Sequence, residues 1–419
     1  MARKSLRRRI DERLAANPDV GAVRRPVTPD ARESFDLYYV RSGPPSEVPL
    51  LVIPGGPGVA SVQTYRGLRR SLAARGVDVV MMEHRGVGLS RCGDDGADLP
   101  PEAMTVDQVV NDAAAVLDAL GVDKAAIYGT SYGSYLAAGI GVRHPDRVAA
   151  MVLDSPVLSA RDMIDVRTAI RSVLLSSSGP AGAQLQAKVH RLLASGRWDS
   201  AHTQVAATVY EVGGPAALSR QLDLLLDGRT VLWRALEHLG GVAMRVVPYH
   251  NEMDLVNRIA FRELDYLGRP DGLPLDPSAG MDRWAELMPG AIPDFEGEPY
   301  DLPAAMPAFD WPTAVLSGGR DLTTPPAIAA RVAALIPGAV LVTLPTAAHS
   351  LLDTRERAAL RVAETVFTGR ESVVPDLVGL AGRGAELDAL PANASVRLAG
   401  VALTAVSTAE QLIPGRWWR

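Results

Sequence analysis

The sequence predicts an α/β fold built on a mostly parallel, doubly wound sheet. Short, continuous apolar runs at 49–53, 77–82 and 148–154 are typical of strands that are covered on both faces. They alternate with segments of helical periodicity, such as 105–120, which opens with the Thr-x-x-Gln spacing of a capping box. This alternation favours a parallel sheet with helices on both faces. Residues 396–406 are a candidate extra edge strand.

The same periodicities divide the chain into three parts. Residues 156–305 have mainly helical patterns followed by a proline-rich stretch, whereas strand-like runs return at 313–317 and 340–344. We therefore interpret 1–155 and 306–419 as two parts of one α/β core, and 156–305 as a helical cap inserted over the strand ends. An independent second domain is the alternative. The cap is preferred because the chemistry described below needs residues from both flanking parts to meet.

Composition and charge narrow the class of protein. The chain has 419 residues, 47% hydrophobic, and a net charge of −5, so it can bury a large core and gives no general reason to expect nucleic acid. Cys92 is the only cysteine, which rules out an intramolecular disulfide and suits a reducing compartment. The basic N-terminus lacks an apolar h-region and fits a solvated segment or a polar helix, with contact to a nucleic acid or an anionic membrane as the alternative. We expect a cytoplasmic protein that binds neither nucleic acid nor membrane; its oligomeric state is not predicted.

The sequence carries no common metal or nucleotide motif. It lacks HExxH, a pair of CxxC motifs, GxxxxGK[ST], and a GxGxxG after the first strand. The residues around Gly86 and Gly88 do not match the motif of a phosphate-binding loop. We therefore expect no metal and no cofactor.

The segment Gly-Thr-Ser-Tyr-Gly at 129–133 has the G-x-S-x-G pattern of a nucleophile elbow. An apolar run precedes it and a stretch rich in small residues follows it, so a strand is expected to turn abruptly into a helix. Gly129 and Gly133 allow the neighbouring backbones to approach closely around this turn. Ser131 is thereby predicted to be an exposed nucleophile, although the pattern is short and recurs by chance.

A serine nucleophile needs a base, and the base needs an acid that fixes its tautomer. With this elbow the chain order is serine, acid, histidine. Asp321 follows the strand-like run at 313–317, and His349 follows the last one. Asp310 is a weaker rival as the acid, and Asp321 could instead cap the next helix. His84 and His250 are rivals as the base, but the first precedes the serine and the second lies in the cap.

The oxyanion formed by attack on a carbonyl requires preorganised amide donors. The N–H of Tyr132, directly after the nucleophile, is one candidate. The second is expected from the Gly/Pro run at 54–58, which follows a strand where such a loop is required, and Gly55 is the best candidate there. A plain Gly-Pro turn is the alternative interpretation of this run.

Five segments together resemble the proline iminopeptidases and tripeptidyl aminopeptidases, which are serine peptidases of the α/β-hydrolase fold. That family shows HGGPG, DQRGxGxS, GxSYGxxLA, GxxDxxTP and a final GH. This chain has PGGPG at 54–58, EHRGVGLS at 83–90, GTSYGSYLA at 129–137, GGRDLTTP at 318–325 and AAHS at 347–350. Pro54, Glu83-His84 and Ala348 depart from the family pattern, whereas the positions of the family's triad are all retained.

The resemblance implies roles for individual residues. Ser131, Asp321 and His349 match the family's triad, and Gly55 and Tyr132 match its oxyanion donors. In that family, acidic residues of the cap bind the free α-amino group of the substrate. Residues 247–252 resemble the cap segment that ends in such an acid, which makes Glu252 the candidate anchor; an ordinary surface acid is the alternative. Gly56 is a further candidate substrate contact.

The sequence thus predicts an α/β hydrolase with a helical cap, acting as a serine aminopeptidase on short peptides or amino-acid amides through an acyl-enzyme. An esterase, lactonase or thioesterase on the same triad is the first alternative. The second is a binding module of the same fold that has no catalytic activity.

Overall fold

The protein is described from a computed structural model. The structure describes residues 2–176, 179–198, 200–243, 246–266, 268–280, 292–368 and 373–412. Within these ranges, no helix combines the length and the apolar character that crossing a membrane requires.

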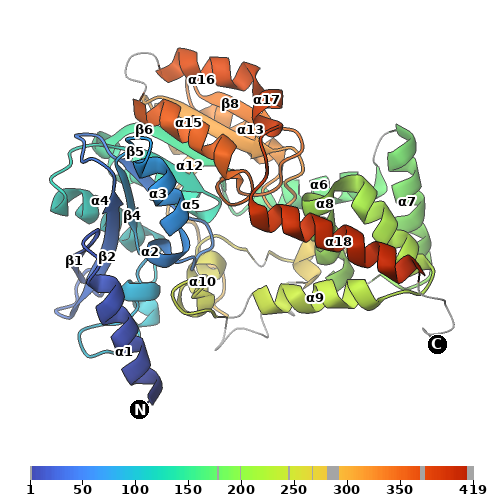
Figure 1. The fold of residues 1–419 in the computed structure, drawn as a ribbon, viewed down its shortest axis with the longest axis horizontal. Coiled ribbons are helices and arrows are strands. Elements are labelled where there is room, and N and C mark those ends of the chain that lie inside the picture. The colour runs from blue at the N-terminus through green and yellow to red at the C-terminus, as the bar shows by residue number, and fades with distance from the viewer. Residues whose placement is uncertain are drawn as a thin grey trace.

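The described residues form one eight-stranded sheet (Figure 1). In spatial order the strands are β1 (Val20–Pro26), β2 (Ser34–Ser42), β4 (Val79–Met82), β3 (Leu50–Ile53), β5 (Ala125–Thr130), β6 (Val148–Asp154), β7 (Thr313–Gly318) and β8 (Val340–Leu344). β1 and β2 form an antiparallel hairpin and β2 pairs antiparallel with β4, whereas all later pairings are parallel. The predicted α/β class with a mostly parallel sheet is confirmed. The hairpin partner β1 was not predicted.

The continuous apolar strands supply two separate cores. In β3, Leu51 and Ile53 pack with one apolar cluster, while Leu50 and Val52 pack with the other. The first cluster includes α4 (Val106–Ala119), α5 (Tyr132–Arg143) and α13 (Pro326–Leu335); the second includes α3 (Arg66–Ala73), α15 (Glu356–Thr368) and α16 (Val373–Gly382). Because successive side chains of a strand point to opposite faces, both faces of β3 are covered and every position in it is apolar.

The 156–305 segment lies beside the sheet and is mainly helical (Figure 1). Its main helices are α6 (Asp162–Leu175), α7 (Gly179–Ala194), α8 (Ser200–Leu226), α9 (Val231–Ala243) and α10 (Met253–Arg262). Side chains from α6 to α9 form a third apolar cluster, separate from the two sheet cores. α8 is kinked at Gly214, whose φ is 73°, and Pro215 follows directly. The domain boundaries at 155 and 305 stay predictions.

The expected edge strand at 396–406 is wrong, because these residues belong to α18 (Ala394–Leu412). Leu403, Ser407 and Glu410 of this helix are buried, and their spacing of three and four residues is that of one helical face. This face packs against α8 and α9, so contact with the 156–305 segment selects a helix over a strand. Figure 1 shows α18 lying across these helices.

Candidate active site

Ser131 lies in the tight turn between β5 and α5. Its φ of 52° and ψ of −124° lie outside the regions that L residues ordinarily occupy. The turn is closed by two glycines: a Cβ on Gly129 would lie 2.2 Å from the carbonyl oxygen of Gly133, and one on Gly133 would lie 2.2 Å from that of Ile53. Only glycine therefore lets β5, α5 and the end of β3 approach this closely, and the approach places the Ser131 hydroxyl at the carboxyl edge of the sheet.

The structure brings the three predicted triad residues into one hydrogen-bonded series. Ser131 Oγ lies 2.9 Å from His349 Nε2, and His349 Nδ1 lies 2.9 Å from Asp321 Oδ2. Asp321 is fully buried, three residues after β7, while the side chain of His349 is 21% exposed. The main-chain amides of Thr323 and Thr324 donate to Asp321 Oδ1 at 2.9 and 2.7 Å. These donors fix the orientation of the carboxylate toward the imidazole.

Electrostatics favour a cationic imidazole at this position. Burial opposes the charged form, but the carboxylates of Asp321 and then Glu211 outweigh it and raise the pKa of His349 to about 9. An imidazolium formed by taking a proton from Ser131 would therefore be stabilised in place. This is the property that a general base paired with a serine needs.

The segment that carries His349 is held from beneath by Asp154, the last residue of β6. Its carboxylate accepts the amides of Leu351 and Leu352 at 3.0 and 2.9 Å, and its carbonyl oxygen accepts the amide of Ser131 at 2.9 Å. One residue thus links the histidine segment to the nucleophile turn. Asp154 could have been found from its position at the carboxyl end of the strand-like run at 148–154. Sequence analysis did not use this position.

The predicted oxyanion residues lie next to the nucleophile. A Cβ added to Gly55 would meet Ser131 Cβ at 3.1 Å and Ser131 Oγ at 3.8 Å, so the glycine loop at 54–58 passes directly over the serine. Tyr132 is the first residue of α5, and the first amides of a helix have no partner within the helix. Gly56 lies in the same loop with a φ of 122°. Its role as a substrate contact stays a prediction.

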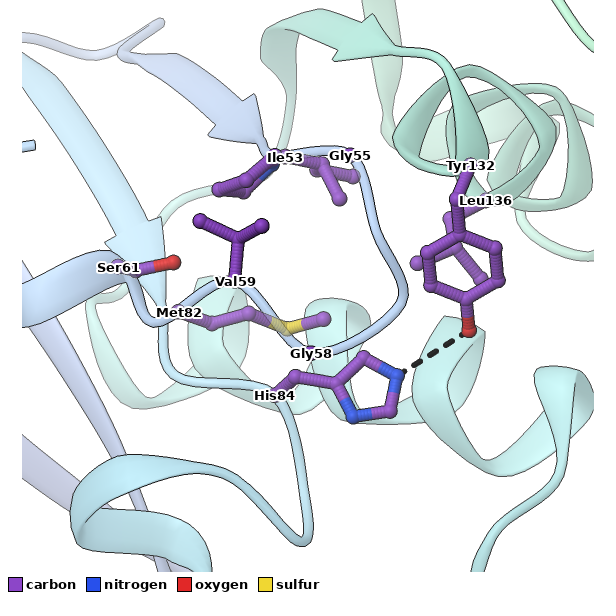
Figure 2. A pocket seen from close by; sticks show the side chains of 10 residues that line it. Ile53, Gly55, Gly58, Val59, Ser61, Met82, His84, Tyr132 and Leu136 are labelled. Atoms are coloured by element: carbon purple, nitrogen blue, oxygen red, sulfur yellow. Dashed lines mark hydrogen bonds between the residues drawn. The ribbon is translucent and has the colours of Figure 1, made fainter. Parts of the chain in front are cut away.

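The glycine loop forms part of the wall of a small pocket (Figure 2). Its walls are Ile53, Pro54, Gly55, Gly58, Val59, Ser61, Met82, His84, Tyr132 and Leu136. His84 Nε2 lies 3.1 Å from Tyr132 Oη and its Nδ1 lies 2.6 Å from the carbonyl oxygen of Arg85. Burial lowers the pKa of His84 to about 4, so this ring is neutral near pH 7. Both nitrogens of this rival base are thus taken up by Tyr132 and the main chain.

The structure gives Glu252 a setting different from the one expected of a substrate anchor. Its fully buried carboxylate pairs with Arg7 of α1 (Ala2–Ala15), whose Nη1 lies 2.9 Å from Oε1. The amide of Gly88 donates to Oε2. The Arg7 guanidinium also lies over the ring of Tyr249, 5.0 Å from its centroid. The carboxylate of Glu252 is therefore already neutralised by a cation of the same chain.

Sequence analysis missed Glu211, an acid of α8 that hydrogen-bonds to the segment carrying Asp321. Its Oε1 accepts the amides of Leu322 and Thr323 at 2.8 and 3.1 Å, and the Thr323 hydroxyl at 3.2 Å. Burial and the nearby Asp321 carboxylate raise the pKa of Glu211 to about 7. No motif marks this residue, and its partners lie 111 and 112 positions away along the chain.

Comparison with known proteins identifies the fold. Residues 48–179 match the family model of the alpha/beta hydrolase fold. A proline iminopeptidase from Mycobacterium smegmatis has a similar crystal structure, with a TM-score of 0.51 and 20% sequence identity over 85% of this chain and 99% of that one. At this identity the structural likeness shows the fold alone.

Curated relatives cover only part of the chain. A proline iminopeptidase from Neisseria meningitidis is 32% identical over 124 residues, which are 29% of this chain and 36% of the relative. A putative carbamate hydrolase from Azorhizobium caulinodans is 30% identical over 145 residues, 35% of this chain and 50% of the relative. The match thus spans between about a third and a half of these relatives' length. The predicted resemblance to proline iminopeptidases is confirmed over this part.

Proposed function

We propose that this chain, an α/β hydrolase by fold, is a serine hydrolase that cleaves N-terminal residues from short peptides or amino-acid amides. The observation that carries the proposal is the hydrogen-bonded series from Ser131 through His349 to Asp321. The glycine loop beside the serine adds the second part that acyl transfer needs.

In the proposed mechanism His349 Nε2 takes the proton of Ser131 as the hydroxyl oxygen attacks the carbonyl carbon. The resulting oxyanion is received by the amides of Tyr132 and Gly55, and Asp321 stabilises the imidazolium. Collapse of the tetrahedral intermediate breaks the C–N bond, and the imidazolium protonates the leaving amine. A water molecule, deprotonated by the same imidazole, then hydrolyses the acyl-enzyme and restores the serine.

The resemblance to proline iminopeptidases supports a peptidase, but one observation favours a second candidate. Glu252, the proposed amine anchor, is buried against Arg7. With that cation in place, Glu252 has no charge to offer a substrate ammonium group. An esterase that uses the same triad without an amine anchor is therefore the second candidate function.

The hydrolase proposal is tested by labelling the folded protein with a fluorophosphonate, which reacts with activated serines. We expect the wild type to be labelled and Ser131→Ala to remain unlabelled at equal folded content. An unlabelled wild type would favour a binding module that lacks catalytic activity.

The peptidase and the esterase are separated by three substrates: a free amino-acid anilide, its N-acetylated form, and a simple aryl ester. An aminopeptidase turns over the free anilide much faster than the acetylated one. Equal turnover of the two anilides, with faster turnover of the ester, would replace the peptidase with the esterase. Glu252→Ala shows in the same assay whether this carboxylate contributes to the preference for a free amine.

A further inference from the structure

The segment that carries Asp321 is held by the 156–305 segment as well as by the core. We call residues 320–324 the acid loop. Glu211 of α8 accepts two main-chain amides and one hydroxyl from this loop. The side chain of Leu322 is buried in the apolar cluster formed by α6 to α9. The acid loop is therefore anchored to helices that lie outside the sheet cores.

The kink of α8 makes a further contact with the acid loop. A Cβ added to Gly214 would lie 2.8 Å from Nη1 and 2.9 Å from the central carbon of the Arg320 guanidinium. The backbone at the kink thus packs directly on the residue that precedes Asp321. Glu211 and Gly214, three residues apart in α8, thus both contact the acid loop.

The hydrogen bonds of Glu211 and Asp321 are physically coupled. The amide of Thr323 lies 3.1 Å from Glu211 Oε1 and 2.9 Å from Asp321 Oδ1, so the two carboxylates share one donor. A shift of α8 that moves Glu211 would move this amide, and with it the orientation of the Asp321 carboxylate. Misplacement of a catalytic constellation by about 1 Å costs up to roughly 100-fold in rate.

We propose that Glu211 is a positioning residue, through which the 156–305 segment holds the acid of the triad in line with His349. This inference rests on the proposed function, because it requires Asp321 to act in a triad. Helix α8 would then help to orient the acid of the triad, in addition to any contact that it makes with the substrate. Seating of α8 on the acid loop then becomes a condition for activity.

The test compares Glu211→Ala and Glu211→Gln, with Glu237→Ala of α9 as the matched control. The readouts are the second-order rate constant of fluorophosphonate labelling between pH 6 and 10 and the thermal midpoint. We expect Glu211→Ala to label about 10-fold more slowly at the high-pH plateau, since the acid loop loses its acceptor. Glu211→Gln keeps an acceptor oxygen and is expected to stay within about 3-fold of the wild type there.

The pH profile distinguishes positioning from a loss of stability. The carboxylates of Asp321, Glu211 and Asp154 act on His349 from three different elements, and Arg320 adjoins the acid. Removing the charge of Glu211 is expected to move the midpoint of the labelling profile to lower pH in both variants. Glu237→Ala is expected to change neither rate nor midpoint.

Two outcomes overturn the inference while leaving the proposed function intact. One is a labelled wild type together with Glu211→Ala that reacts at the wild-type rate. The other, which decides the matter if the alanine variant fails to fold, is Glu211→Gln with an unchanged midpoint. An unlabelled wild type would overturn the proposed function itself, so the two failures are distinguishable.

Discussion

The backbone strain at Ser131 leads to a prediction about stability that is independent of the substrate. A residue other than glycine in such a region costs about 1–3 kcal/mol. Ser131→Gly removes this cost but adds about 0.5–1 kcal/mol of backbone entropy lost on folding. Ser131→Ala keeps the Cβ and therefore keeps the strain. Both variants lose the hydrogen bond from Oγ to His349, so their difference isolates the backbone.

We expect Ser131→Gly to be more stable than Ser131→Ala by about 1–2 kcal/mol, while neither variant is labelled by a fluorophosphonate. Unfolding entropy of about 2.1 cal/mol/K per residue makes each kcal/mol worth roughly 1 °C in a chain of 419 residues. Differential scanning calorimetry at a fixed scan rate should therefore separate the two variants by about 1–2 °C. Equal midpoints, or a lower midpoint for the glycine variant, would refute the claim that the elbow stores strain.

Three further predictions concern the base, the elbow and the N-terminal helix. Because neighbouring carboxylates raise the pKa of His349 to about 9, ester hydrolysis is expected to rise with pH as the imidazole loses its proton, with a midpoint near that value; a flat profile from pH 6 to 10 would contradict it. Gly133→Ala is expected to unfold or inactivate the protein, because its Cβ would lie 2.2 Å from the carbonyl oxygen of the last residue of β3. The control is Gly67→Ala, which has nothing within 4 Å of its Cβ; in urea unfolding it should be neutral or stabilising by under about 1 kcal/mol. Arg7→Ala leaves the fully buried carboxylate of Glu252 without its cation and should lower the free energy of unfolding by about 2 kcal/mol. Arg8→Ala breaks an exposed pair in the same helix and should lower it by under about 0.5 kcal/mol, so equal losses would argue against the buried pair.

The sheet and the three residues of the proposed triad were accessible from sequence because their signals are local. Each parallel strand is a short apolar run whose alternate positions feed two cores, as in Leu50–Ile53. Ser131 is marked by its flanking glycines, and Asp321 and His349 are marked by following strands. Parallel strands bring their carboxyl ends to one edge, so position along the chain was enough to predict that the three meet.

The features that escaped sequence analysis depend on distant partners. The setting of Glu252 depends on Arg7, 245 positions away, and nothing within residues 247–252 indicates a cation in the first helix. Glu211 lies within a helix whose neighbouring residues carry no motif. Residues 396–406, a candidate edge strand from sequence, form part of a helix whose buried face is defined by its packing against α8 and α9. In each case tertiary contact, not local propensity, decides the outcome.

Helix α18 connects the segment that follows His349 with the helices of the 156–305 segment. Just before its first turn, the side-chain amide of Asn393 donates to the carbonyl oxygen of Asp353, and the main-chain amide of Asn393 donates to that of Thr354. Both acceptors lie a few residues beyond His349. Near its other end, Glu410 accepts the amides of Val231 and Leu232 at the start of α9. A chain shortened at residue 393 would keep the whole sheet and all three members of the proposed triad but lose this brace. Because α18 also packs against α8 beside its kink, trimming this one helix would loosen the seating of α8 on the acid loop without removing any of the reacting groups.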